Sequence, residues 1–394
     1  MFKTEIEMDE KTYNVENIAP YSDEEAVVAL GKVADHPSVP WISKYIFSNQ
    51  PETYLRDILK GISSIDEFQR LVMSEAIEWV INTSVRNFSY DGFSKLQELS
   101  GKNVFMSNHR DIILDPAFTN LILFRNKMQL TEICVGDNLL QSKTIEYLIR
   151  SNRMIKVIRG ISARELYLSS KVLSEYIRST VTSGKSSVWI AQKQGRTKDG
   201  IDKTEQGLLK MLDMSGTGDF VHNFMELSIV PLSISYEYEP CDILKAREIL
   251  ISRTQKYVKT ENEDLQSIML GIKQQKGNVH LNFGDPLTED EIREASEADK
   301  NDRYQSIRHA IDRRVIEGYR LWKTNYIAYD LVNHSFKYAD RYSPEDMEKF
   351  ILYTEQQLDK VEPTLNRNEL RNIFLHIYGN PVMTKESAES ESRG

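Results

Sequence analysis

Apolar residues follow one spacing before residue 100 and another after it. In the N-terminal part they recur at helical intervals, most clearly over residues 64–85, where the expected role of the apolar face is packing on a core. Residues 22–25 read Ser-Asp-Glu-Glu, the form of a capping box that begins a helix. The pattern therefore predicts a helical N-terminal region over residues 1–100.

From residue 101, short β-rich runs alternate with helical segments. Strands are predicted at 103–107, 131–135, 154–158, 186–191, 228–235 and 279–283, and helices at 116–128, 140–151, 162–182 and 204–214. Strands that alternate with helices form a largely parallel sheet with helices on both faces. We therefore predict an α/β fold with a largely parallel central sheet flanked by helices, in a domain over residues 101–290.

Helical additions are expected around this domain. A polar insertion over residues 242–275 precedes the last strand, and residues 291–380 form a predicted helical C-terminal region in which Pro344 begins a new element. The last residues of the chain are rich in Ser and Glu. The segment 381–394 is therefore predicted to be a disordered tail.

Composition narrows the class of protein. The 394 residues carry a formal net charge of −9, which argues against a dedicated nucleic-acid binder because phosphate neutralisation needs clustered Lys and Arg. The two cysteines cannot build a disulfide framework or a CxxC metal pair. The N-terminus lacks the apolar core of a signal peptide, and no run approaches the ~18 apolar residues of a spanning helix. The expected location is the cytoplasm, with any contact to lipid peripheral, at the inner face of the membrane.

The main candidate for chemistry is a histidine with nearby aspartates, directly after the predicted strand 103–107. His109 is followed by Asp111 and Asp115, and functional residues of open α/β sheets gather at the carboxyl ends of strands. A carboxylate that holds one imidazole nitrogen lets the other nitrogen act as a general base. A His-Asp pair alone is more often structural than catalytic, and either aspartate could be the partner.

Cationic side chains form a second candidate group. Arg159, Arg196 and Lys198 end or follow predicted strands whose neighbour carries His109, so all are expected to face one cleft. Guanidinium groups suit bidentate binding of phosphate, and Gly195 would let backbone amides approach an anion. The alternative is that these are solvated surface charges, which for a single arginine is the commoner case.

Three other signals are set aside. Residues 184–186 (Gly-Lys-Ser) match the end of a phosphate-binding P-loop, but Ser179 replaces the upstream glycine and a strand follows where a helix is needed. His109 and Asp111 could be two metal ligands, but no third His or Cys lies at ligand spacing, so no metal site is predicted. No serine lies in a Gly-x-Ser-x-Gly elbow, which argues against a covalent hydrolase.

Several segments together resemble the glycerolipid acyltransferases, the family of glycerol-3-phosphate and lysophosphatidic acid acyltransferases. Asn-His followed by Asp-Pro within residues 108–116 is similar to the first family motif, in which four residues separate His from Asp, whereas five separate His109 from Asp115. The remaining motifs follow in the family's order at 154–159, 189–200 and 229–233, with a Gly-Asp-Pro turn within 283–287. The resemblance covers roughly residues 100–290, about half of the chain.

The resemblance implies a reaction. His109, oriented by Asp115 or else by Asp111, would deprotonate an acceptor hydroxyl that attacks the thioester of acyl-CoA or acyl carrier protein. Backbone amides near the start of the following helix would stabilise the oxyanion. The acyl chain would lie along an apolar groove completed by the terminal helices. No metal or tightly bound cofactor is implied, and the donor is a co-substrate.

The resemblance also implies an acceptor. Arg159, Gly195 and Arg196, with Lys198, would bind the phosphate of glycerol 3-phosphate or a lysophospholipid. Gln194 stands where the family has a glutamate that helps to hold acceptor hydroxyls. Two alternatives therefore stay open: an acyltransferase with a different acceptor, such as an amino-acid-based lipid, and a non-catalytic lipid- or protein-binding module on the same fold.

Overall fold

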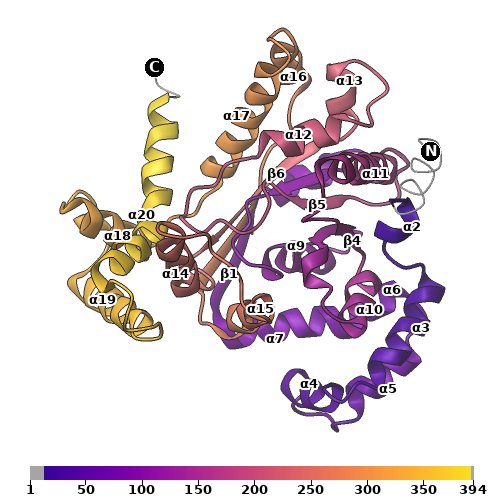
Figure 1. Cartoon of the computed structure of the whole chain (residues 1–394), viewed down its shortest axis with the longest axis horizontal. Coiled ribbons are helices and arrows are strands. Elements are labelled where there is room, and N and C mark those ends of the chain that lie inside the picture. Colours follow the sequence, from indigo (N-terminus) through magenta and orange to yellow (C-terminus); the bar gives the residue numbers. More distant parts are fainter. Residues whose placement is uncertain (1–12, 392–394) are drawn as a thin grey trace.

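The computed structural model describes residues 13–391 and shows one central sheet flanked by helices (Figure 1). The seven strands of this part are β1 (Val85–Asp91), β2 (Val104–Ser107), β3 (Glu132–Gly136), β4 (Met154–Val157), β5 (Val188–Ala191), β6 (Ile229–Tyr236) and β7 (Gly277–Phe283). They lie in the order β1-β7-β6-β2-β5-β3-β4. Strands β2 to β6 are parallel, whereas β7 is antiparallel to β6 and β1 is parallel to β7. The predicted α/β class with a largely parallel sheet is confirmed.

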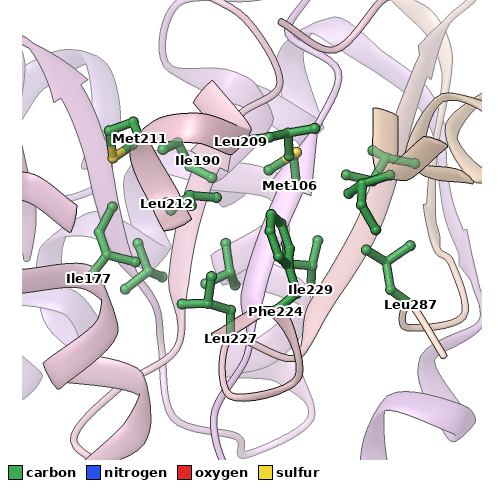
Figure 2. Close-up of a cluster of buried hydrophobic side chains, with 14 of the residues drawn as sticks. Met106, Ile177, Ile190, Leu209, Met211, Leu212, Phe224, Leu227, Ile229 and Leu287 are labelled. Atoms are coloured by element: carbon green, nitrogen blue, oxygen red, sulfur yellow. The ribbon is translucent and has the colours of Figure 1, made fainter. Parts of the chain in front are cut away.

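Helices cover both faces of the sheet because side chains alternate along its strands. In β2, Val104 and Met106 face one layer and Phe105 faces the other. The first layer contains α11 (Ala163–Thr182), α12 (Gln206–Asp213), α13 (Phe220–Met225) and α17 (Asp302–Glu317), and the second contains α7 (Ser74–Ser84) and α9 (Leu114–Arg125). Figure 2 shows the core of the first layer, a cluster that includes Met106, Leu209 and Phe224. Every side chain of β2 is buried, so the residues that follow it start from a rigid strand.

The N-terminal region is helical up to residue 84. Its helices are α2 (Val15–Ile18), α3 (Asp23–Ala34), α4 (Val39–Ile46), α5 (Tyr54–Gly61), α6 (Ile65–Phe68), the π-helix η1 (Gln69–Met73) and α7. The predicted capping box is present, with Ser22 and Glu25 at the start of α3. Leu30 and Leu59 of these helices pack against Leu148 of α10 (Lys143–Ser151). Within residues 13–391, no helix is both long and apolar enough to cross a membrane.

The prediction that residues 1–100 form a helical region is wrong near its end. Residues 85–91 form β1, an edge strand, and α8 (Phe93–Glu98) follows it. β1 pairs in parallel with β7, which places Phe88 beside Val279. The strand has no fully buried side chain and its partner lies far along the chain, so its local pattern did not reveal it.

α14 of the insertion packs with the last helices of the C-terminal region beside the sheet, at the left of Figure 1. The insertion forms α14 (Asp242–Ser252) and α15 (Glu263–Lys273), helical as predicted. After α16 (Glu289–Ser296) and α17 come α18 (Lys323–Asn333), α19 (Pro344–Leu358) and α20 (Arg367–Glu391). Pro344 begins α19, as predicted. Ile243 and Ala246 of α14 pack with Ile327 and Phe374 of the C-terminal helices, so the insertion is anchored to them.

The prediction of a disordered tail over residues 381–394 is also wrong. α20 continues through Pro381 to Glu391, while residues 392–394 lie outside the described part of the chain. Val382 is buried, Lys385 donates a hydrogen bond to the carbonyl oxygen of Tyr319 (2.8 Å), and Glu386 is paired with Lys337. These contacts with distant residues stabilise a segment whose composition alone suggests disorder.

Gly200 gives a test of how α20 is held. Its φ is +80°, and a Cβ at this position would lie 2.3 Å from the carbonyl oxygen of Ile377 in α20. We expect Gly200→Ala to lower the free energy of unfolding by at least ~1–2 kcal/mol, because of the left-handed backbone alone. The matched control Gly207→Ala, at an exposed position of α12 with open space around it, should raise it by about 0.5–1 kcal/mol. Urea unfolding measures both, and equal stability of Gly200→Ala and wild type would contradict the role of Gly200.

Candidate active site

A cavity of about 310 Å³ lies at the carboxyl ends of the parallel strands. It is lined by five of the residues selected from the sequence, which are His109, Arg159, Gly195, Arg196 and Lys198. The structure therefore brings the candidate base and the candidate anion-binding residues together. One expectation is corrected, because Arg159 does not follow a neighbour of β2: its strand, β4, is at the sheet edge, beyond β5 and β3.

The partner of His109 is Asp115, in the first turn of α9. His109 Nδ1 lies 2.9 Å from Asp115 Oδ2, which also accepts the backbone N–H groups of Arg110 (2.6 Å) and Asp111 (2.9 Å). The Asp115 side chain is 1% exposed and the His109 side chain 13%. Since Nδ1 is held by the carboxylate, Nε2 is the nitrogen left for a ligand in the cavity.

The second oxygen of Asp115 also has a donor. The hydroxyl of Tyr236, in β6, donates to Asp115 Oδ1 over 2.7 Å. Burial, followed by the adjacent Asp115 carboxylate, raises the pKa of Tyr236 well above its usual value. Tyr236 therefore remains a donor, and both oxygens of Asp115 have hydrogen-bond partners. The histidine ring also contacts the edge of Trp189, with ring centroids 5.8 Å apart.

Asp111 has a different place. Its Oδ1 accepts the backbone N–H groups of Ile113 and Leu114, both at 2.9 Å, and so caps the start of α9. Its buried Oδ2 has no hydrogen-bond partner among the described residues and faces Gly271, where a Cβ would approach to 2.2 Å. Burial, and then the charge of Asp115, raise the pKa of Asp111 above its usual value. Asp111 therefore shapes the loop and does not contact His109.

The expected oxyanion donors at the start of α9 are largely occupied. The backbone N–H groups of Arg110 and Asp111 donate to Asp115, and those of Ile113 and Leu114 donate to Asp111. These four amides are satisfied by carboxylates. They are therefore unsuitable as donors to a developing oxyanion.

The loop after β5 is hydrogen-bonded to the loop that carries His109. Gly195 has a φ of +77°, a backbone conformation that residues with a side chain rarely adopt. At this glycine the chain turns back toward β2. The backbone N–H of Thr197 then donates to the carbonyl oxygen of His109 over 2.7 Å. Gln194 is exposed and does not line the cavity, and its backbone N–H donates to Glu205 over 3.3 Å. The residue that replaces the family's glutamate therefore lies outside the cavity.

The cationic side chains differ in their surroundings. The Arg159 guanidinium packs on Gly136, where a Cβ would lie 2.7 Å from Cζ, and burial lowers the pKa of Arg159. Arg196 has a buried Nη1 with no hydrogen-bond partner in residues 13–391. Lys198 forms an ion pair with Glu248 of α14. Arg159 and Arg196 are thus better placed than Lys198 to accept an anion directly.

A buried carboxylate that sequence analysis missed lies behind both loops. Asp202 accepts hydrogen bonds from Asn108 Nδ2 (2.9 Å), Arg110 Nη2 (2.7 Å), Thr197 Oγ1 (2.5 Å) and the Tyr319 hydroxyl (2.5 Å). Burial acts to raise the pKa of Asp202, but the Arg110 charge and these donors hold it below its usual value. No local motif marks Asp202, because its donors are scattered along the chain.

The insertion also contributes residues that sequence analysis missed. Glu248 of α14, Lys259 of the connecting segment and Asp264, Leu265 and Ile268 of α15 line the cavity. Their signal in the sequence was only that of a polar helical segment. The insertion is therefore one wall of the cavity.

A second, apolar cavity of about 150 Å³ adjoins the first. Ile113, Ile133 and Met154 line both, and Met73 and Ile77 extend the second toward η1 and α7. The N-terminal helices thus complete an apolar groove, as expected. Within the described residues, the C-terminal helices α18 to α20 line neither of these two cavities, which corrects the other half of that expectation.

Among residues 13–391, no group of three or more His, Cys, Asp or Glu side chains is placed to hold a metal ion. Cys134 and Cys241 are free thiols, and Cys134 lines the first cavity. The residues that converge here are a histidine-carboxylate pair, cations and apolar side chains.

The fold and the site define an α/β protein in which a candidate general base lies beside cationic side chains. Curated relatives indicate which proteins the chain resembles. The chain is 25% identical over 200 residues to the dihydroxyacetone phosphate acyltransferase of Bos taurus, covering 50% of this chain and 28% of that protein. It is also 25% identical over 230 residues to the glycerol-3-phosphate acyltransferase of Pseudomonas aeruginosa (strain LESB58), covering 57% and 26%. The chain thus spans little more than a quarter of these relatives' length. The similarity to glycerolipid acyltransferases inferred from the motifs is confirmed, at low identity.

Two further comparisons add less. No protein-family model matches the chain. The solved 1-acyl-sn-glycerophosphate (LPA) acyltransferase of Thermotoga maritima is 12% identical and aligns over 74% of this chain and 94% of that one, with a TM-score of 0.37. That similarity is too low to carry an argument.

Asp111 gives a testable pH effect on stability. The pKa of Asp111 in the folded protein is raised above the usual 3.8. The contribution of its protonated form to the free energy of unfolding is therefore present at low pH and is lost as the pH rises beyond that value. The variant Asp111→Asn has an amide at this position, which does not ionise. Its free energy of unfolding relative to wild type should therefore increase between about pH 4 and pH 7. Urea unfolding over this pH range measures the difference, with Asp290→Asn at an exposed position of α16 as the control for the amide itself, and a falling difference would refute the expectation.

Proposed function

We propose that this chain transfers a fatty acyl group from a thioester, acyl-CoA or acyl carrier protein, to the hydroxyl of glycerol 3-phosphate or a lysophospholipid. The observation that carries the proposal is that His109, held by Asp115, lines a cavity that is also lined by cations and adjoins a second, apolar cavity. An acyl transfer to a phosphate-bearing alcohol needs all three features. The names of the curated relatives, both acyltransferases acting on phosphate-bearing acceptors, support it.

In the proposed reaction His109 is the general base. Its Nε2 removes the proton of the acceptor hydroxyl as that oxygen attacks the thioester carbonyl carbon. The imidazolium is stabilised by Asp115 at Nδ1. The tetrahedral intermediate then collapses with cleavage of the C–S bond, and His109 returns the proton to the departing thiolate. No covalent acyl-enzyme is needed.

Arg159 and Arg196 are proposed to hold the acceptor phosphate, with Gly195 allowing its close approach. The acyl chain is proposed to occupy the apolar cavity bounded by Ile113 and Met154. We place the reaction in the cytoplasm. Because the product partitions into lipid, we propose that the protein is in peripheral contact with the inner face of the membrane. A thiol-release assay with acyl-CoA and acyl carrier protein, across glycerol 3-phosphate, lysophospholipids and amino-acid-based lipids, tests donor and acceptor together. No release with any pair would refute the function.

The catalytic pair yields the first activity prediction. His109→Ala should lower turnover by ~10²–10⁴-fold while leaving the fold intact, because the base is lost but little packing is. Asp115→Asn should also be severe, since an amide favours the wrong tautomer of His109. Asp111→Asn is the matched control, because Asp111 does not contact the ring, and it should have a far smaller effect.

Steady-state rates and circular dichroism of the three variants decide the assignment. A folded His109→Ala protein with wild-type turnover would remove His109 from the reaction. Greater loss in Asp111→Asn than in Asp115→Asn would transfer the orienting role to Asp111.

The two arginines yield a prediction about the acceptor. Replacing Arg159 or Arg196 with Ala should weaken acceptor binding by about 2 kcal/mol or more, seen as a higher acceptor KM with little change in the donor KM. Replacement with Lys should fall between, because charge is kept and the fork geometry is lost. If the donor KM rises instead, the pocket holds the pantetheine phosphates. If neither KM changes, these arginines do not bind substrate.

A further inference from the structure

The cavity carries more positive than negative side chains. Its charged lining consists of Arg159, Arg196, Lys198 and Lys259 against Glu248 and Asp264, besides His109. With the histidine neutral, two positive charges remain in excess. The strand-end loops supply three of the cations, whereas the insertion supplies Lys259 and both carboxylates.

Each lysine is paired with a carboxylate of the insertion. Lys259 Nζ lies 2.5 Å from Asp264 Oδ1, and Lys198 is paired with Glu248. Asp264 Oδ2 in turn accepts from Asn138 Nδ2 over 2.9 Å. Asp264 is anchored, with a side chain 11% exposed, while Lys259 is 46% exposed and has freedom to move. An ion pair of this exposure is weak, so an anion in the cavity can compete for the lysine.

Arg159 and Arg196 also line the cavity, and the carboxylates whose charges act most on Arg159 are Asp137 and Asp264. Arg196 Nη1 is buried without a hydrogen-bond partner in the described residues, and a buried donor left unpaired is costly. The charge of Arg196 acts on Asp264 and that of Asp264 acts on Arg159, so the three groups share one local field. Arg159, Arg196 and Lys259 therefore form a cationic end of the cavity beside Asp264.

We propose that Lys259 is a further acceptor-binding residue. Its side chain breaks its pair with Asp264 and binds a phosphate monoester dianion, which is held between Arg159 and Arg196. This inference rests on the proposed function and narrows its substrate class. A phosphate monoester carries ≈ −1.5 to −2 charges at pH 7, which matches the excess of two positive charges. A phosphodiester or zwitterionic head group would leave part of that charge uncompensated. Acceptors with a terminal phosphate are thus selected over other lysolipids.

The insertion keeps Lys259 beside the cavity because its helices are docked on the loop of His109. Gly271 of α15 lies against Asp111 Oδ2, an approach that any side chain would obstruct. Lys245 of α14 donates to the carbonyl oxygen of Arg110 over 2.6 Å. Both helices that flank Lys259 are therefore fixed relative to the candidate base.

Isothermal calorimetry with glycerol 3-phosphate and the whole chain tests the proposal. Lys259→Gln should weaken binding roughly 3- to 10-fold, because one charge-assisted contact at a half-exposed position is lost. Asp264→Asn should tighten binding by about 2- to 5-fold, since the amide removes the competing charge. Lys256→Gln, an exposed lysine of the same segment outside the cavity, is the matched control and should bind as wild type does.

The signs of the two effects decide the outcome. If both variants weaken binding, the Lys259–Asp264 pair only supports the fold of the insertion, and the proposal is overturned. Unchanged binding by Lys259→Gln overturns it as well. The thiol-release assay is separate: a protein that binds glycerol 3-phosphate with these shifts yet transfers no acyl group would refute the proposed reaction and not the phosphate site.

Discussion

The site depends on the buried carboxylate of Asp202. A charge in a low-dielectric interior is tolerated only when its oxygens are satisfied, and Asp202 takes donors from the loop after β2, the loop after β5 and the segment before α18. Losing one donor would leave the charge uncompensated, so the loops are held in one arrangement. His109 and Arg196 each lie next to residues bonded to Asp202, so this requirement helps to position both, together with the bond of His109 to Asp115.

The same constraint extends to the helical additions. Arg110, which pairs with Asp202, also faces Glu239, and Lys245 bridges Glu239 and the carbonyl oxygen of Arg110. The insertion is thereby bonded to the loop of the candidate base, and its far side packs on the C-terminal helices. A segment that the sequence marks only as polar becomes one wall of the cavity, because its charged residues turn inward.

Much of the fold could be predicted because it depends on short-range patterns. Strands β2 to β7 appear as short apolar runs with ends within two residues of prediction, and the carboxyl ends of parallel strands share one edge. That is why residues as far apart as His109 and Arg196 could be grouped in advance. The exceptions are β1 and the end of α20. Both are stabilised by distant partners, β7 for the strand and Tyr319 and Lys337 for the helix, which no local pattern records.

The sequence by itself determined the α/β class, the positions of β2 to β7 and the grouping of His109 with Arg159 and Arg196, since these follow from side-chain periodicity and from the order of elements. It favoured Asp115 as the partner of His109, through the similarity of Asp115-Pro116 to the family motif, but left Asp111 open. Only the tertiary structure decided between them, by bringing Tyr236 from β6 to the second oxygen of Asp115 and Gly271 from α15 against Asp111. Which carboxylate holds the histidine depends on which is supplied with hydrogen-bond donors once both are buried, and those donors come from elements far along the chain.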